Sequence, residues 1–231
     1  MALFTDADRL ARMIGWVKTI ETEVADVLLQ HHIFWQVQDI IRNNRHLANA
    51  RSHFFEWMGD VFVASAAVAV RRQVDGHDDS VCLRRLLREA KDYAHIVTRP
   101  FYLSLCVTPG SEPFLKEINE HAFDEWAGAG GQHLDALVVE RDLQQLIDTC
   151  QTIQHYATKR VAHYDKHGVT PQKMPTFEDL DKAYEVIKSL TQKYYLMLTG
   201  VWIGNVQPTI AYPWTDIFTV PWIPPRSREV H

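Results

Sequence analysis

The sequence predicts an all-α protein, an antiparallel bundle of helices followed by an extended C-terminal arm rich in proline and tryptophan. Apolar residues recur three and four positions apart through most of the chain, which is the spacing of one helical face. No proline precedes Pro100, and only Gly15 and Gly59 precede Gly76, so the first half can carry long helices. Strand signals are weak throughout. Amphipathic helices without strands are expected to bury their apolar faces against one another.

Composition limits the classes of protein that this chain could be. Its 231 residues are 46% hydrophobic, which is typical of a globular protein with a sizeable core. The net charge of -5, from 24 basic and 29 acidic residues, provides no basic field for unspecific binding of nucleic acid. Any contact with RNA must therefore be local.

Cysteine usage and apolar runs indicate the compartment. Cys82, Cys106 and Cys150 are odd in number and lack a CxxC pairing, which argues against a disulfide framework and for a reducing environment. No apolar run approaches the roughly 18 residues that span a membrane, and the N-terminus lacks the order of a signal peptide. We therefore expect a cytoplasmic protein without a membrane partner.

Three helices are expected in the first 76 residues. The first begins near Asp6 or Asp8, a plausible cap, and runs to about Gln30. A second apolar set follows in residues 31–44, and Ser52 opens a third helix that ends at the turn Asp75-Gly76. The expected apolar positions of the first two are Leu10, Met13, Ile14, Val17, Ile20, Val24, Phe34, Val37, Ile40 and Ile41.

The middle of the chain is less regular. Ser80 is a reasonable N-cap for a short helix that ends near Ala90. Between residues 98 and 132 proline and glycine return and the periodicity fades, so we expect a connecting region with short helical pieces such as residues 114–126. The glycine cluster at 127–133 is interpreted as a flexible link.

The strongest helical pattern covers residues 134–165, and Gly168 and Pro171 end it. Thr176, with Asp179 three positions later, resembles a capping box for a last helix over about 177–199. We divide the chain into a helical domain, 1–207, and an extended arm, 208–231. The large apolar side chains of the arm should cover the bundle or a partner: Trp214, Ile217, Phe218 and Trp222.

The end of the 134–165 helix carries the candidate site. On an α-helix, Tyr156, Arg160, His163 and His167 are spaced by four, three and four residues and share one face. A guanidinium binds phosphate, and an imidazole can transfer protons near neutral pH. The pair is the minimum equipment for metal-independent RNA cleavage. The alternative interpretation is an ordinary polar helix end facing water.

Two stretches resemble the HEPN superfamily (higher eukaryotes and prokaryotes nucleotide-binding), particularly its AbiU-like abortive-infection branch. They are KRVAHYDK at 159–166 and AVAVRRQVDGHDDSVCLRRLLREA at 67–90. The resemblance implies a helical bundle that often forms homodimers and, in many relatives, a ribonuclease active in phage defence or toxin-antitoxin pairs. A partner antitoxin protein would belong to such a pair. No cofactor is implied.

The same resemblance implies roles for individual residues. The superfamily motif is an arginine, four to six residues, then a histidine. The usual arginine position is occupied by Ala157, while Arg160 fits this gap with His167. Arg160 would hold the scissile phosphate and His163 would be general acid or base. Two further roles are expected: assistance from Lys159 or Tyr156, and orientation of an imidazole by Asp165.

Several alternatives remain open from the sequence. His163 and His167 have the spacing of two zinc ligands on one helix, but no HExxH motif or second ligand pair accompanies them, so we expect no metal. The basic region 42–57 is either a solvated turn or an RNA-contact surface. A non-catalytic HEPN module that binds a nucleotide, RNA or a protein is the second function. For the first function, we expect a homodimer with residues 156–167 of both chains lining its groove.

Overall fold

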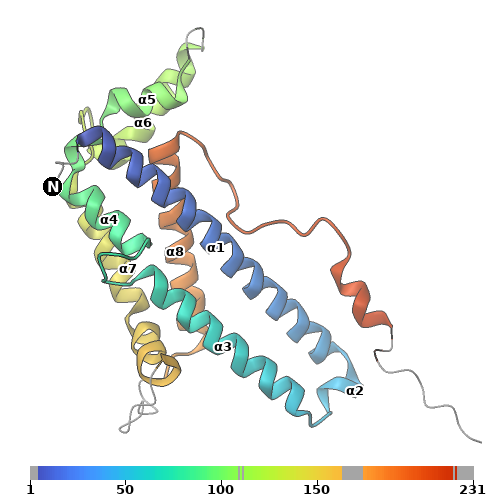
Figure 1. The fold of residues 1–231 in the computed structure, drawn as a ribbon. Helices are drawn as coiled ribbons and strands as arrows, with labels where there is room; N and C mark the ends of the chain where they lie inside the picture. The colour runs from blue at the N-terminus through green and yellow to red at the C-terminus, as the bar shows by residue number, and fades with distance from the viewer. Residues whose placement is uncertain (1–4, 109, 111, 163–173, 221, 223–231) are drawn as a thin grey trace, which may run out of the picture.

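The computed structural model describes residues 5–108, 110, 112–162, 174–220 and 222, and in them it is all-α, as the sequence predicts (Figure 1). No strand occurs in these residues, although an antiparallel bridge joins Thr98 and His133. The helices are α1 (Asp6–Asn43), α2 (Arg45–Ala48), α3 (His53–Gln73), α4 (Leu83–Asp92), η1 (Ala94–Ile96), α5 (Arg99–Cys106), α6 (Pro113–Ala127), α7 (Ala136–Tyr156), the π-helix η2 (Ala157–Ala162), α8 (Phe177–Thr199) and the 3-10 helix η4 (Trp214–Thr219).

Helix α1 joins the first two predicted apolar segments into one helix of 38 residues. Its cap is Thr5, one residue before the predicted start. The Thr5 hydroxyl accepts a hydrogen bond from the Asp8 amide at 3.2 Å, and the Asp8 carboxylate accepts one from the Thr5 amide at 3.0 Å. Asp8 is therefore the returning half of a capping box and not the cap itself.

One predicted cap is confirmed at the start of α3, and another is corrected in the turn from α3 to α4. The Ser52 hydroxyl accepts from the Phe54 amide at 3.2 Å and caps α3, as expected. Ser80 does not cap α4, which starts at Leu83. Its hydroxyl donates to the carboxylate of Asp75 at 2.7 Å, inside the turn. The buried Gln73 accepts from the Leu83 amide at 3.2 Å and so satisfies the start of α4 from the preceding helix.

The glycine cluster at 127–133 is a hydrogen-bonded turn, in contrast to the flexible link that we predicted. Arg99 donates to the carbonyl oxygens of Glu120 at 2.8 Å and Gly131 at 2.9 Å, and to the carboxylate of Asp124 at 2.5 Å. Asp124 also accepts from the Gly130 amide at 3.0 Å. The side chain of Arg99 thus holds both ends of the α6–α7 connection together.

The main core lies where α1, α4, α7 and α8 pack together (Figure 1). The predicted capping box of α8 is present, with the Thr176 hydroxyl accepting from the Asp179 amide at 3.1 Å and the Asp179 carboxylate accepting from the Thr176 amide at 2.8 Å. Gly200 ends α8 with φ of 70°, where an added Cβ would approach Leu105 Cβ at 2.6 Å. The side chains fully buried in this core include Met13, Val17, Ile20, Leu83, Leu86, Leu87, Val139, Leu146, Cys150, Tyr194 and Met197.

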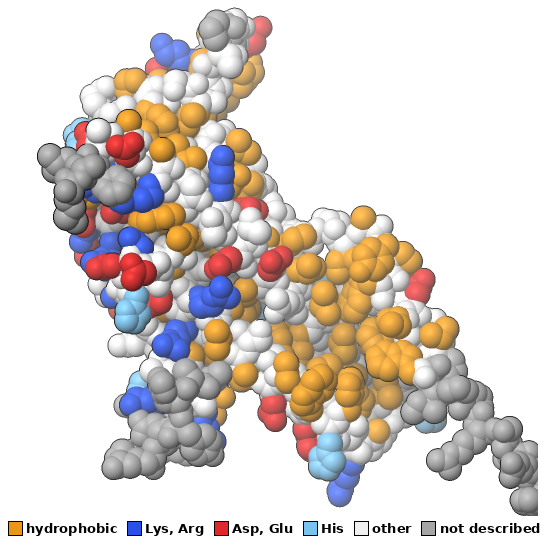
Figure 2. All heavy atoms as spheres, in the orientation of Figure 1, with side chains coloured by type: hydrophobic (Ala, Val, Ile, Leu, Met, Phe, Trp, Pro, Cys, Tyr) orange, Lys and Arg blue, Asp and Glu red, His pale blue; other side chains and the backbone are white. Residues whose placement is uncertain are grey.

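Helices α1 and α3 extend beyond this core as a helical hairpin closed by α2 (Figure 1). Apolar side chains gather over this end of the molecule in Figure 2. The arm is not wholly extended, because η4 interrupts it. The indole of Trp214 donates to Gln36 of α1 at 3.1 Å, whereas Ile217, Phe218 and Trp222 are exposed. Of these four side chains of the arm, only Trp214 is therefore half-buried in the described chain.

Candidate functional site

The C-terminal end of α7 changes its helix type at the candidate site. Asp135 caps α7 by accepting from the Leu137 amide at 2.8 Å, and α-helical geometry continues to Tyr156. Residues Ala157–Ala162 then form a π-helix. A π-helix closes its hydrogen bonds from residue i to i+5, so residues four apart no longer lie directly above one another. Within residues 157–162 the α-helical spacing assumed for the predicted face is therefore not kept.

Ala157 is a core residue with 0% of its surface exposed. This is the position where the resembled motif usually has its arginine. A guanidinium at this place would have to lose its hydration inside the bundle, which costs several kcal/mol for an unpaired charge. The alanine is therefore explained by close packing of this turn in the core.

Three of the six predicted site residues lie in the described part of the chain. Tyr156 and Lys159 are half-buried, and Arg160 is exposed. The turn before them is tied to α7, because the Thr158 hydroxyl donates to the Gln154 carbonyl at 2.9 Å. The remaining three, His163, Asp165 and His167, lie outside the described residues. The structure thus brings Tyr156, Lys159 and Arg160 onto consecutive turns at one end of the bundle.

A small apolar cavity of about 130 Å³ lies beside Tyr156. Sites that enclose a drug-sized ligand usually measure about 300 to 1,000 Å³. This cavity is too small to enclose a nucleotide, so a ligand of Arg160 would have to bind across the surface. The cavity is lined by Val63, Ala66, Ala67, Ile153, Tyr156, Pro175, Thr176, Phe177 and Leu180.

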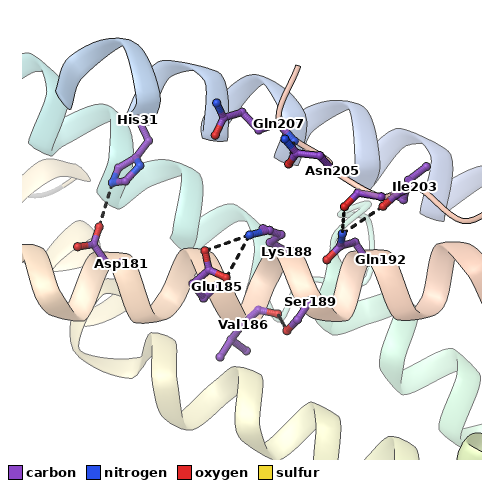
Figure 3. Close-up of polar contacts among 11 residues, drawn as sticks. His31, Asp181, Glu185, Val186, Lys188, Ser189, Gln192, Ile203, Asn205 and Gln207 are labelled. Atoms are coloured by element: carbon purple, nitrogen blue, oxygen red, sulfur yellow. Dashed lines mark hydrogen bonds and ion pairs between the residues drawn. The ribbon is translucent and has the colours of Figure 1, made fainter. Parts of the chain in front are cut away.

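A larger polar groove, of about 400 Å³, lies between α1, α8 and the segment after α8 (Figure 3). Sequence reasoning missed it, because His31 and Asp181 are 150 positions apart and no local motif connects them. The groove is lined by Leu28, His31, Trp35, Asp181, Tyr184, Glu185, Lys188, Asn205 and Gln207.

The imidazole of His31 is the most densely contacted polar group of the groove. Its Nε2 lies 2.9 Å from Asp181 Oδ1 and also 2.9 Å from the indole nitrogen of Trp35. One ring nitrogen cannot both donate to the carboxylate and accept from the indole. The ring also meets Tyr184 edge-on at 5.1 Å, and burial raises the pKa of the Tyr184 hydroxyl, which therefore stays protonated.

The other charges of the groove are largely paired with one another. Lys188 Nζ lies 3.2 Å from both carboxylate oxygens of Glu185 (Figure 3). The side-chain amide of Gln192 donates to the carbonyl oxygens of Ile203 at 3.1 Å and Gly204 at 3.2 Å. These bonds hold the segment after α8 in place. We therefore interpret the groove chiefly as a polar connection between α1 and α8.

The other candidate groups from the sequence are placed as follows. The described residues hold no group of three histidine, cysteine or acidic side chains that could bind a metal ion. In the basic region, Arg42 lies 3.5 Å from Asp39 and 5.5 Å from the ring of Trp35, and His53 lies 2.8 Å from Glu56. These side chains form exposed local pairs at the hairpin tip.

Comparisons with protein-family models, with curated proteins and with solved structures find no match to this chain. Function must therefore be argued from the geometry of its own residues. Two regions present side chains that could bind another molecule. One is the end of α7, which presents Lys159 and Arg160, and the other is the outer side of the α1–α3 hairpin, which presents apolar side chains.

Proposed function

We propose that this chain is a HEPN-like protein of the AbiU type that cleaves RNA without a metal at the end of α7. The observation that carries the proposal is the exposed Arg160 beside Lys159 on the π-helical turn, three positions before His163. Single-turn π-helical segments within α-helices are rare and are frequent at functional sites. Two adjacent cations at one end of a chain with net charge -5 form a local site for phosphate.

The proposed reaction is an intramolecular transesterification. A general base removes the proton of a ribose 2'-hydroxyl, the oxygen attacks phosphorus, and a general acid protonates the 5'-oxygen as its bond to phosphorus breaks. His163 serves as the base or the acid, and Arg160 stabilises the added negative charge on the phosphoryl oxygens. Lys159 or Tyr156 assists, and Asp165 orients an imidazole.

The proposed setting follows from this chemistry and from the motif. An RNA-cleaving protein of this type would act in the cytoplasm as the toxin of an antiphage or toxin-antitoxin system, with an antitoxin protein as partner. RNA binding by one exposed arginine and its neighbouring lysine depends on charge, so affinity should fall as salt concentration rises.

Ala157 favours a second candidate, a non-catalytic module that binds a nucleotide, RNA or a protein through the same turn. Its burial removes the arginine position of the usual motif from the surface. In that case Arg160 and Lys159 would still bind phosphate or an acidic partner, but no bond would be cut.

Cleavage of RNA by purified protein in the presence of a chelator tests the proposal. His163→Ala should reduce the cleavage rate by about 100 to 10,000-fold, the usual contribution of positioned acid-base catalysis, with little change in RNA affinity. Arg160→Ala should weaken both affinity and turnover. Arg141→Ala, which removes an exposed arginine near the start of α7, is the matched control and should leave both unchanged.

His167→Ala separates the two possible partners of Arg160. If only this variant loses activity, Arg160 and His167 form the arginine–histidine pair of the motif, and the role assigned to His163 is wrong. Wild-type protein that binds RNA without cutting it would favour the second candidate. Wild-type protein that neither cuts nor binds RNA would exclude ribonuclease function.

A further inference from the structure

The outer face of α3 is apolar and exposed at its N-terminal end. Phe54, Trp57 and Val61 follow one another at intervals of three and four residues, so they share one side of the helix. They are 49%, 59% and 49% exposed, respectively. Figure 2 shows apolar side chains gathered over the hairpin end, with charged side chains at its tip. A contiguous apolar stripe of this kind is a candidate surface for contact with another molecule.

The same face continues toward the C-terminal end of α3 with small side chains. Ala64, Ser65 and Val68 follow at helical spacing, and beside them α1 and α3 enclose a groove of about 350 Å³. One helix thus presents large side chains at one end and a hollow at the other. The groove is lined by Val27, Gln30, Phe62, Ala64, Ser65, Ala66, Val68, Ala69, Arg72 and Tyr184.

Charge on α3 is divided in the same way. Glu56 and Asp60 are exposed near the aromatic end, and Arg71 and Arg72 lie at the grooved end. Arg72 is 66% exposed at its side chain, although it lies 3.3 Å from Glu23 of α1. The outer face of α3 therefore has acidic and aromatic groups at one end, and basic groups and a groove at the other. When two copies of this face are antiparallel, acidic groups lie opposite basic groups and aromatic side chains lie opposite the groove.

We propose that the outer face of α3 binds a second copy of this chain, with the two α3 helices antiparallel about a two-fold axis between Ala64 and Ser65. In this register Val61 lies against the partner's Val68, and Trp57 against the partner's Arg72. The aromatic end of each helix meets the grooved end of the other. Asp60, which flanks the stripe, then lies near the basic end of the opposite helix, and each chain contributes the same surface, as in an isologous contact.

The area of this contact is sufficient only when the groove is included. Phe54, Trp57 and Val61 expose on the order of 300 Å² of apolar surface, judged from the usual area of such side chains. A standard interface buries about 800 Å² on each partner. The remaining area would come from the walls of the α1–α3 groove, which extends the contact onto Val27 and Gln30.

A lipid bilayer is the other occupant to consider, because α3 is the described helix that could cross one by length and composition. Only a small part of its most apolar stretch is buried within the described chain. However, its inner residues Ala66, Ala67 and Val70 belong to the core of the bundle. The acidic Glu56 and Asp60 beside the stripe would also oppose binding to anionic lipid. A second copy matches the charges better.

This pairing would separate the two candidate catalytic sites. Val63 and Ala67 line the cavity beside Tyr156, on the side of α3 away from Val61. The two 156–162 segments would therefore lie on opposite sides of the paired helices, unlike the shared groove expected from the sequence. The inference does not rest on the proposed function, because molecular mass and RNA cleavage are measured separately.

Sedimentation velocity of the full chain across micromolar concentrations tests the contact. We expect wild-type protein to sediment as a dimer at tens of micromolar, and Val61→Asp to raise the dimer dissociation constant at least tenfold. Leu137→Asp is the matched control, because Leu137 is 72% exposed on α7, and it should remain dimeric. Circular dichroism should show the same helix content in both variants, and the same melting temperature at concentrations low enough for both to be monomeric.

Cysteine crosslinking with a short bis-maleimide tests the register. Ser65→Cys should link two chains, whereas Ser189→Cys, an exposed serine on α8, should give only the background of the native cysteines. Val61→Cys mixed with Val68→Cys should link more efficiently than either alone. A parallel pair would instead link Val61→Cys to itself.

Three results would overturn the proposal. They are a wild-type monomer at tens of micromolar, a dimer that Val61→Asp leaves intact, and equal crosslinking of Ser65→Cys and Ser189→Cys. A wild-type monomer that sediments with anionic lipid vesicles, and loses this binding on Val61→Asp, would assign the face to a membrane and also exclude the dimer.

Discussion

The two ends of the α1–α3 pair have similar apolar periodicity but very different burial. In the first half of α1, Met13, Val17 and Ile20 are fully buried against the other helices, whereas in its last fourteen or so residues only Phe34 is buried. Helix α3 has the opposite arrangement, with Ala66 and Val70 buried near its end and no buried residue in its first half.

This difference shows what amphipathic spacing does and does not determine. The pattern predicts a helix in both ends, because helical spacing depends only on the positions of apolar residues along the chain. Burial depends on whether other helices reach those positions. Helices α4 and α7 cover the first end but not the hairpin, so the hairpin keeps its apolar side chains available for another molecule.

Core truncation should give the largest contrast between the two ends. Leu146→Ala removes a fully buried side chain of α7 and should lower the free energy of unfolding by about 2 to 5 kcal/mol. Phe54→Ala, at the exposed end, should change it by less than about 0.5 kcal/mol in the monomer. Urea unfolding at submicromolar concentration measures both. Equal losses would show that the hairpin is packed as tightly as the core.

Arg99→Ala should have the next largest effect, on the packed end alone. It removes donors to two carbonyl oxygens and to Asp124, with only 12% of the arginine side chain exposed. A loss of about 1 to 3 kcal/mol is expected, because partly buried acceptors would lose the charged donor that satisfies them. Hydrogen exchange should increase at residues 127–133 and remain unchanged in the hairpin. Unchanged exchange at this turn would contradict its assigned role.

Deletion of residues 208–231 tests how far the arm contributes to the hairpin end. Trp214 is half-buried and donates to Gln36, so its loss should cost about 1 kcal/mol and lower the melting temperature by roughly 2 to 4 °C. Trp222→Ala is the control, because this side chain is 62% exposed. A soluble truncation with an unchanged melting curve would show that the arm is dispensable for stability.

The smallest effect should come from the cap of α8, and it should depend on pH. Thr176→Ala should cost about 1 kcal/mol at neutral pH. Hydrogen bonds from the backbone and side chain of Thr176 lower the pKa of Asp179 below its ordinary value of 3.8. A carboxyl group whose pKa is lower in the folded than in the unfolded protein stabilises the fold at pH values above its unfolded pKa. This stabilisation is lost as the pH falls through the folded pKa. The cost of Thr176→Ala should therefore shrink below about pH 4, and a constant cost would refute this coupling.

The features that could be predicted from the sequence are those coded by neighbouring residues. The helices, the Ser52 cap and the Thr176 capping box depend on residues a few positions apart, so local chemistry determines them. Ser80 was misassigned because its competing partner, Asp75, lies in the same turn, while the group that satisfies α4 comes from Gln73. Local propensity cannot rank these alternatives without the turn geometry.

The candidate site could be predicted only in part. Apolar spacing along the helix put Ala157 on its buried face, and the structure bears this out, but nothing in the spacing signalled the change to a π-helix after Tyr156. The pairing of His31 with Asp181 was equally inaccessible, because it requires knowing that α1 and α8 lie side by side.

The packing of α1 against α8 also determines when this protein can fold as it is synthesised. Most of the buried apolar residues of α1 lie within the first 30 residues, yet α8 begins only at Phe177. At about 5 to 20 residues per second, a ribosome needs on the order of 10 s to supply that partner. During this interval Met13 and Val17 have no α8 to pack against, so the nascent chain should depend on chaperones until its last helix emerges.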